Sequence, residues 1–269
     1  MAPYKSLLMQ EPEPGIAVVT LNRPDRLNAF DYATVEEIHA CLTHFESANN
    51  VRVVILTGAG RGFSAGTDLK SSRADNGEPV NVSKQMRAQR FIADMVLHMR
   101  RIPQPIIAAI NGVAAGGGFS LTMATDIRIA AQSARFICSY INVGLSSGEI
   151  GSSYFLPRLI GLSRAADLLY TGRTMDADEA LRIGYVSRVV PDGEALNAAL
   201  ETARIMLEKS PFGLRMTKEV LNHSIDAQSL EAALYMENRT QTLGVVSGDF
   251  RTAAKAFTEK RKPVYDTEA

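Results

Sequence analysis

The chain is predicted to be an α/β protein with a strand-containing core and a helical C-terminal part. Apolar runs rich in β-branched residues alternate with segments of helical spacing in the first half of the sequence. From Gly161 onward almost every segment has helical spacing instead. The 269 residues, of which 46% are apolar, are enough to bury a substantial core. Alternating strands and helices followed by a run of helices predict this fold class.

The first half contains the predicted strands. Four short apolar runs have the composition of buried strands, namely residues 16–21, 51–57, 105–110 and 126–130. Residues 22–26 form a turn after the first of them. Residues 71–82 are polar, contain Gly and Pro and lack periodicity, so we expect a mobile surface segment there.

Helices are predicted between these strands. Asp31 can cap a helix whose apolar positions recur at helical spacing, at Val35, Ile38, Leu42 and Phe45. A longer helix covers residues 83–101, and a short one covers residues 119–124. The apolar positions of the longer helix are Met86, Ile92, Met95 and Met99. Such a Met-rich face is typical of core packing, although it could also line an apolar ligand pocket.

The second half is predicted to be helical apart from one strand near residues 185–190. The expected helices are residues 163–170, 176–182, 193–208, 211–222, 229–242 and 249–261. We expect a core of residues 1–200 and a helical C-terminal region of residues 201–269, with no linker between them.

Composition excludes several function classes. The 29 basic and 29 acidic residues cancel, which argues against a nucleic-acid partner or an anionic membrane. Cys41 and Cys138 are too few for a disulfide framework, and the four histidines lack metal-ligand spacing, so we expect no metal. The N-terminus lacks a signal-peptide pattern, and no apolar run reaches the roughly 18 residues of a membrane helix. A cytoplasmic location is the expectation.

Two loops of small residues are the candidate site. Residues 60–68 and 111–118 each follow a predicted strand, and both are rich in Gly, Ala and Ser. Small residues let a ligand approach the backbone and leave peptide N–H groups free to donate to it. If the two loops meet, two such amides would form an oxyanion hole, which stabilises an enolate.

The first loop also matches two unrelated motifs. Gly62-Phe63-Ser64-Ala65-Gly66 fits the nucleophile elbow of serine hydrolases. That elbow requires the strand to end at its first Gly, but four residues separate the predicted strand from it. Residues 60–65 fit a dinucleotide-binding variant, but the acidic residue expected after the next strand is missing. The sequence therefore favours neither a serine hydrolase nor a dinucleotide-binding protein.

The motifs taken together resemble the enoyl-CoA hydratase/isomerase (crotonase) family. The matching segments appear in family order across nearly the whole chain. They are residues 21–29 (LNRPDRLNA), 62–69 (GFSAGTDL), 111–118 with the triple glycine, 126–130 (DIRIA), 156–161 (LPRLIG), 184–190 (GYVSRVV) and 259–263 (EKRKP). The resemblance implies a crotonase-like spiral of ββα units, whose helical C-terminal region supports a homotrimer or a dimer of trimers.

The resemblance also assigns site residues. The oxyanion-hole amides map to Thr67 and Gly117, and Gly117 opens the short helix. Coenzyme A is expected as part of the thioester substrate rather than as a separate cofactor. Its binding positions map to Arg26, Ser64, Ala65, Gly66, Asp68, Lys70, Gly116, Gly118 and Lys260. Asp68 could instead brace the turn, and Lys260 could be a solvated helix end.

The chain departs from the family pattern at the two catalytic acids. Ser120 and Tyr140 stand where family hydratases carry glutamates, and a hydroxyl of ordinary pKa serves poorly as acid or base at neutral pH. Glu149 lies in the loop where dienoyl-CoA isomerases, members of the same family, carry an acid. It could shuttle a proton, activate a water, or be merely a surface residue or a cap of the helix expected near Gly151. Tyr140 and Ser147 could position a water or a proton.

We therefore expect an acyl-CoA enzyme of fatty-acid or related metabolism. Single-carboxylate proton transfer by Glu149 is favoured over two-glutamate hydration. The alternative is a non-catalytic acyl-CoA-binding protein that retains the oxyanion hole.

Overall fold

The structure, a computed structural model, describes residues 4–68 and 81–265. The strands are β1 (Leu7–Glu13), β2 (Ile16–Leu21), β3 (Val53–Gly58), β4 (Gly62–Ser64), β5 (Ile106–Ile110), β6 (Val113–Ala115), β7 (Ile127–Ala131), β8 (Arg135–Ile137), β9 (Thr174–Asp176) and β10 (Arg188–Val190). The helices are α1 (Tyr32–Ser47), α3 (Val82–Arg101), α4 (Gly117–Met123), α5 (Ser152–Ile160), α6 (Leu162–Thr171), α7 (Ala177–Arg182), α8 (Ala195–Leu207), α9 (Pro211–Ser224), α10 (Leu230–Val246) and α11 (Asp249–Thr258).

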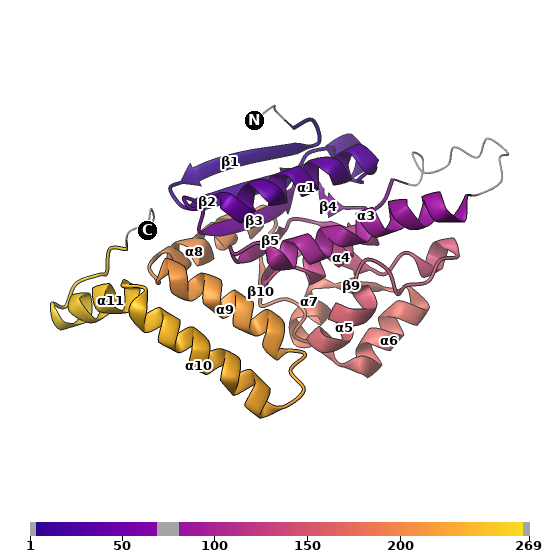
Figure 1. Cartoon of the computed structure of the whole chain (residues 1–269). Coiled ribbons are helices and arrows are strands. Elements are labelled where there is room, and N and C mark those ends of the chain that lie inside the picture. The colour runs from indigo at the N-terminus through magenta and orange to yellow at the C-terminus, as the bar shows by residue number, and fades with distance from the viewer. Residues whose placement is uncertain (1–3, 69–80, 266–269) are drawn as a thin grey trace.

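Successive strands are shared between two sheets. Within the described residues, one sheet has the order β1-β2-β3-β5-β7-β10 and the other the order β4-β6-β8-β9. Each of the pairs β3/β4, β5/β6 and β7/β8 therefore sends its first strand to the larger sheet and its second to the smaller one. In the larger sheet β2 pairs with β3, β3 with β5, β5 with β7 and β7 with β10, and all of these pairings are parallel. A helix follows each strand pair (Figure 1), which is the predicted spiral of ββα units.

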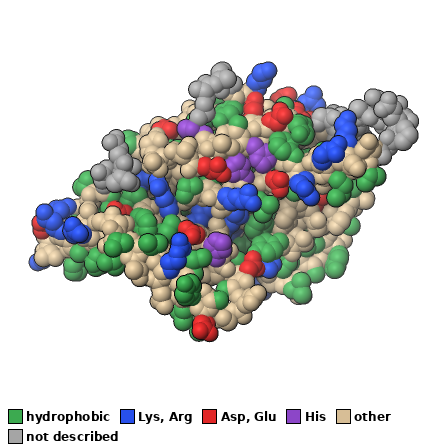
Figure 2. Space-filling view, viewed as in Figure 1, with side chains coloured by type: hydrophobic (Ala, Val, Ile, Leu, Met, Phe, Trp, Pro, Cys, Tyr) green, Lys and Arg blue, Asp and Glu red, His purple; other side chains and the backbone are tan. Residues whose placement is uncertain are grey.

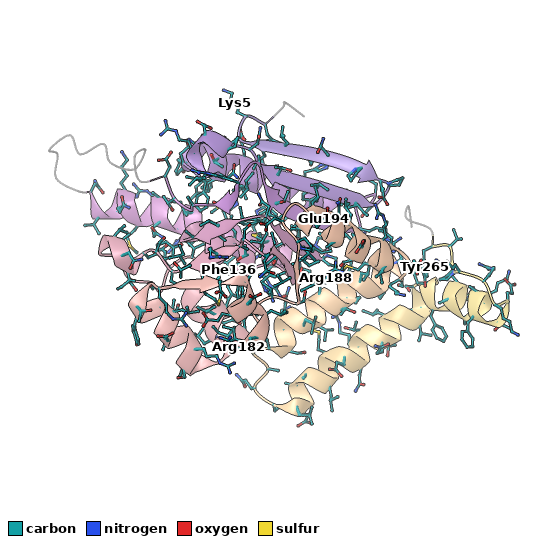
Figure 3. All side chains as sticks on the ribbon, turned by 180° about the vertical axis from the view of Figure 1, so that it is seen from behind. Lys5, Phe136, Arg182, Arg188, Glu194 and Tyr265 are labelled. Atoms are coloured by element: carbon teal, nitrogen blue, oxygen red, sulfur yellow. The ribbon has the colours of Figure 1, made fainter. Side chains whose placement is uncertain are left out.

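The larger sheet is buried on both faces because its strands are apolar at consecutive positions. Ile16 and Val18 face a second core on one side of the sheet. Small residues of α8, among them Ala199, pack against them there. Ala17, Val19 and Leu21 face the main core together with α1, α3 and α4. Side chains alternate between the faces of a strand, so a continuous apolar run is what a sheet between two helical layers requires. Figure 3 shows Phe136 of β8 inside the molecule, where it is fully buried.

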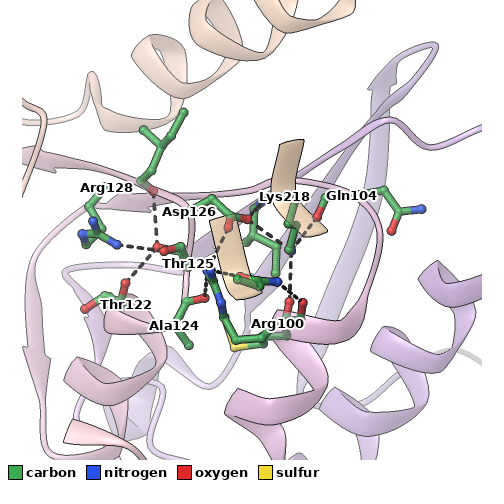
Figure 4. A network of polar contacts seen from close by, with 12 residues as sticks. Arg100, Gln104, Thr122, Ala124, Thr125, Asp126, Arg128 and Lys218 are labelled. Carbon is green, nitrogen blue, oxygen red and sulfur yellow. Dashed lines mark hydrogen bonds and ion pairs between the residues drawn. The ribbon is translucent and has the colours of Figure 1, made fainter. Parts of the chain in front are cut away.

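A buried lysine anchors α9 to this core. The Nζ of Lys218 donates to the carbonyls of Met99 (3.1 Å) and Gln104 (2.8 Å) and lies 3.2 Å from a carboxylate oxygen of Asp126. The guanidinium of Arg100 donates to the other oxygen of Asp126 at 2.8 Å (Figure 4). These bonds satisfy the buried charges, since an unpaired ammonium in an apolar interior would be very costly.

The C-terminal helices α9, α10 and α11 lie along one side of the molecule (Figure 1). Many of their apolar side chains are exposed, including Leu221, Leu234, Tyr235 and Phe257. The predicted boundary at residue 200 falls within α8, which packs on the larger sheet, so the helical extension begins after Leu207. Figure 2 shows acidic and basic side chains interspersed over the viewed face, as the balanced charge suggests.

Most predicted elements are present at or within a few residues of the expected bounds. Asp31 caps α1 by accepting the Thr34 N–H at 2.9 Å, and the four predicted apolar positions of α1 are buried. Met95 and Met99 pack in the main core, whereas Met86 is exposed. The prediction for residues 71–82 lies almost wholly outside the described residues. No helix in the described ranges has the length and apolarity to traverse a lipid bilayer.

Candidate active site

The two small-residue loops meet in the structure. β4 pairs in parallel with β6, which brings the chain after Ser64 alongside the chain after Ala115. A Cβ built on Gly66 would lie 2.6 Å from the Ala115 carbonyl oxygen, and one built on Gly118 would lie 2.3 Å from the Ser64 carbonyl oxygen. Only glycine permits so close an approach of two backbones. The expected meeting of the loops is therefore present.

The Thr67 amide points away from Phe30, with which Thr67 forms an isolated β-bridge. The Phe30 N–H donates to the Gly66 carbonyl and the Asp68 N–H donates to the Phe30 carbonyl, both at 2.9 Å. Because backbone groups alternate in direction along an extended chain, the N–H of Thr67 faces the opposite side. The Gly117 N–H opens α4 and so has no acceptor within that helix. Neither amide donates to a protein acceptor among residues 4–68 and 81–265.

A buried polar network holds the first loop. The side-chain amide of Asn28 donates to the carbonyls of Ala59 and Gly62, each at 2.8 Å. The Ser64 hydroxyl donates to the Asn28 carbonyl at 2.8 Å and accepts the Gly66 N–H at 3.1 Å. Ser64 is fully buried and no helix begins at it, so it lacks the geometry of a nucleophile elbow. Its role is to shape the turn.

The surroundings of Gly116 and Gly117 in the second loop explain why neither position can carry a side chain. Gly116 has a φ of +50°, and a Cβ there would lie 2.9 Å from the Ser139 hydroxyl. A Cβ on Gly117 would lie 2.4 Å from Cζ of Phe30. The triple glycine thus lets α4 begin directly against the first loop.

A pocket of about 210 Å³ opens beside the two amides. Thr67, Gly117, Tyr140 and Glu149 all line it, together with residues of α3 such as Gln89. The structure therefore brings the predicted oxyanion-hole residues and the predicted acid into one cavity, although they lie far apart in the sequence.

Two hydroxyls occupy the positions of the missing glutamates. Ser120 and Tyr140 share a hydrogen bond of 3.3 Å between their oxygens, and the Ser120 hydroxyl lies 3.3 Å from the Glu149 carbonyl. Burial raises the pKa of Tyr140 above its ordinary value, so its phenol stays neutral at physiological pH. Ser147 is not among the lining residues of this pocket. Neither hydroxyl of the pair can accept a proton readily.

The Glu149 carboxylate is half-buried in the pocket wall. Its Oε1 accepts a hydrogen bond from Nε2 of Gln89, while its backbone N–H donates to the Ser152 hydroxyl at 3.0 Å. Burial raises the pKa of Glu149, and the hydrogen bonds from Gln89 and from the Ile150 N–H act in the opposite direction. No side chain caps α5, which begins after Gly151, so the helix-cap reading of Glu149 is wrong.

The backbone next to Glu149 is strained. Ile150 has a φ of +45°, in a region that β-branched residues rarely adopt. Its side chain is only 4% exposed, and its Cδ1 reaches the backbone of Gly117, 3.2 Å from where a Cβ would stand. Tight packing against the second loop therefore holds a conformation that costs energy, as is frequent at functional sites.

The other predicted binding residues are dispersed. Arg26 is exposed and lies 3.8 Å from the Asp25 carboxylate. Asp68 is buried and lies 3.4 Å from the Arg23 guanidinium, as the bracing interpretation expects. Lys70 lies outside the described residues. Lys260 is exposed after α11, which lies at the end of the molecule opposite to the N-terminal end of α3 (Figure 1).

Sequence reasoning missed Gln89. A single glutamine within a helix carries no distinguishing pattern. The one available signal is its spacing, since Gln89 precedes the apolar Ile92 by three residues and thus shares its helix face.

The chain is similar to known proteins over nearly its whole length. A family model described as "Enoyl-CoA hydratase/isomerase" matches residues 11–268. The chain is 42% identical to the "Probable enoyl-CoA hydratase echA12" of Mycobacterium bovis, over 98% of this chain and 95% of that protein. It is 36% identical to the 1,2-epoxyphenylacetyl-CoA isomerase of Escherichia coli, over 96% and 97%. The crystal structure of an enoyl-CoA hydratase from Bacillus anthracis superposes with a TM-score of 0.92 at 36% identity, covering 98% of this chain and all (100%) of that one.

Proposed function

Because the chain belongs to the enoyl-CoA hydratase/isomerase family, we propose that its pocket isomerises an acyl-CoA thioester by proton transfer through Glu149. Membership makes the protein an enzyme of hydratase or isomerase type that acts on acyl-CoA. The observation that carries the finer proposal is the composition of the pocket. Among the residues that the structure describes, one carboxylate, that of Glu149, lines it beside the Thr67 and Gly117 amides, and hydroxyls stand at the usual acid positions.

The two amides stabilise the charge that develops on the substrate. With the thioester oxygen between Thr67 and Gly117, Glu149 takes a proton from a carbon of the acyl chain. The electron pair of that C–H bond moves into the chain and places negative charge on the thioester oxygen as an enolate. Preorganised amide donors are worth roughly a hundred- to a thousandfold in rate each.

The same carboxylate then completes the reaction. Glu149, now protonated, returns its proton to a different carbon, so that the double bond shifts and no water is added. Burial favours this role, because a raised pKa brings the carboxyl closer to the neutral range in which it can both accept and donate. Hydration would need a second acid or base, and Ser120 and Tyr140 supply neither well. A relative at 36% identity is named as an isomerase of an acyl-CoA, 1,2-epoxyphenylacetyl-CoA, which supports isomerisation as the reaction class.

Coenzyme A would lie along the first loop. The proposal places it near Arg26 and against the backbone of residues 64–68. The proposal assigns Lys260 to the coenzyme bound by a neighbouring subunit. A homotrimer or a dimer of trimers, acting in the cytoplasm, accommodates that arrangement.

The test is mass spectrometry of 2-enoyl-CoA and 3-enoyl-CoA substrates incubated with the protein in deuterated water. Deuterium uptake with a shifted double bond and no gain of water supports the proposal. Glu149→Gln is expected to slow that exchange by about a hundred- to ten-thousandfold. Glu231→Gln, an exposed site on α10, is the control and should match the parent protein.

Other results would redirect the function. Addition of a whole water would establish a hydratase and overturn isomerisation. Exchange that is unchanged in Glu149→Gln would remove Glu149 from the mechanism. Tight binding of acyl-CoA with neither exchange nor hydration would favour the non-catalytic alternative.

A further inference from the structure

The carboxylate of Glu149 has one side-chain partner within the described residues, and that partner is Gln89. Gln89 lies on α3, is half-buried, and lines the same pocket as Glu149. Its Nε2 donates to Oε1 of Glu149. No lysine, arginine or histidine in residues 4–68 and 81–265 forms an ion pair with this carboxylate; the ion pairs of these residues lie elsewhere. A neutral side-chain amide, together with the Ile150 N–H, therefore holds the proposed base.

We propose that Gln89 is a positioning residue that, by its bond to Oε1, holds the Glu149 carboxylate in the orientation in which it takes and returns the substrate proton. The inference rests on the proposed function of Glu149. It assigns to α3 a part in the reaction that neither the family motifs nor the small-residue loops supply.

An amide suits this task better than a charged partner. An arginine or lysine at this distance would stabilise the carboxylate so strongly that it would become a weak base. A glutamine donates a hydrogen bond without adding charge, so it opposes the effect of burial only in part. The carboxylate is held in place and remains basic enough to accept a proton.

The helix that carries Gln89 is rigidly mounted, which positioning requires. The Phe91 carbonyl, two residues away, lies 3.0 Å from Nε2 of His39 on α1. His39 and His98 are joined through their Nδ1 atoms at 3.1 Å, which ties the far end of α3 to the same helix. Met95 adds buried packing in the main core. Glu149 is fixed from the other side by the packing of Ile150 against Gly117.

Two substitutions separate the amide donor from the bulk of the side chain. Gln89→Met keeps similar length and volume but removes the donor. Gln89→Glu keeps the shape but brings a second carboxylate to Glu149, and like charges at this distance raise a pKa. Gln10→Met, at an exposed position on β1, is the residue-matched control.

The first measurement is the titration of the Glu149 carboxyl carbon by ¹³C NMR in the free protein, with Glu149→Gln used to assign the signal. We expect the midpoint to move to higher pH in Gln89→Met and further in Gln89→Glu, with no change in Gln10→Met. The second is the pH profile of deuterium exchange into substrate. The low-pH limb of this profile should shift to higher pH in the same order of variants. We expect kcat to fall roughly ten- to a hundredfold while KM stays nearly constant, as for the loss of a hydrogen bond to a charged group.

The two measurements distinguish this inference from the proposed function. If the Glu149 titration is the same in the parent, Gln89→Met and Gln89→Glu, the positioning role is wrong even for an active enzyme. If the titration moves in the expected order but the parent protein turns over no substrate, the isomerase proposal fails while the Gln89–Glu149 coupling stands. A fall in activity without any movement of the low-pH limb would mean a merely structural role for Gln89 and would overturn the inference.

Discussion

The backbones of Gly66 and Gly117 are in direct contact: a Cβ built on Gly66 would lie 2.7 Å from the amide nitrogen of Gly117. This contact places the end of the first loop against the start of α4 without any intervening side chain. The relative position of the Thr67 and Gly117 amides is therefore set by contact between two backbones. Close-packed interiors have low compressibility, so this position is rigid. An oxyanion hole needs that rigidity, because its donors act only where the charge develops.

The first prediction concerns Gly117→Ala. The new Cβ would lie 2.4 Å from Cζ of Phe30, a ring that is itself buried, so the second loop must shift. We expect deuterium exchange into substrate to fall by at least about a hundredfold through displacement of one amide donor, with a loss of about 1–3 kcal/mol of stability from overpacking. Gly62→Ala is the control, since its nearest neighbour would be 3.7 Å away. Equal exchange rates in the two variants would contradict the assignment of Gly117.

A second prediction tests the network under the first loop. Asn28 has a φ of +55°, and its side-chain amide nitrogen donates to the carbonyls of Ala59, which is half-buried, and Gly62, which is buried. Asn28→Ala should lower the free energy of unfolding by about 2–4 kcal/mol, because the Ala59 carbonyl loses this donor, the Gly62 carbonyl keeps only the longer bond from Asn111 (3.3 Å), and alanine disfavours this backbone. Denaturant unfolding measures the change. Asn197→Ala, which removes an exposed bond to Glu194, should change stability by less than about 0.5 kcal/mol. A similar small loss in Asn28→Ala would show that the network contributes little.

The third prediction concerns pH and Lys218. Burial lowers the pKa of Lys218 to about 8, although the nearby Asp126 carboxylate opposes the effect. Above that pH the folded protein releases a proton that the unfolded chain keeps until near the ordinary lysine pKa of 10.5. The stability of the parent protein should therefore rise with pH relative to Lys218→Met, by about 1 kcal/mol between pH 7 and pH 9. Comparison with the variant cancels titrations common to both proteins. A difference that stays constant or falls over this interval would be inconsistent with the lowered pKa.

The elements that could be predicted from sequence are those whose information is local. The helix after Asp31 has its cap and its four apolar positions within one short stretch, and α1 begins and packs as expected. The strand of residues 16–21 is β2 without any shift in its bounds. Strands β4, β6, β8 and β9 escaped prediction because three residues are too few to display a period. β1 escaped it because only Leu7 of its residues is buried, so the strand has no clear apolar face.

The candidate site likewise has features that the sequence could predict and features that it could not. The amino-acid sequence by itself determined the α/β class, the family, the two loops whose glycines allow close backbone approach, and the absence of acids at residues 120 and 140. Only the tertiary structure decided that Glu149 lines the pocket and that Gln89 is its partner, and it replaced the helix-cap reading with a carboxylate held against α3. The physical reason is the separation along the sequence over which each signal acts. Periodicity, caps and glycine requirements act between residues near in sequence, whereas the Gln89–Glu149 contact joins α3 to a distant loop. That contact exists only because α1 and the main core fix the helix, and because packing against Gly117 holds Ile150 in a strained conformation.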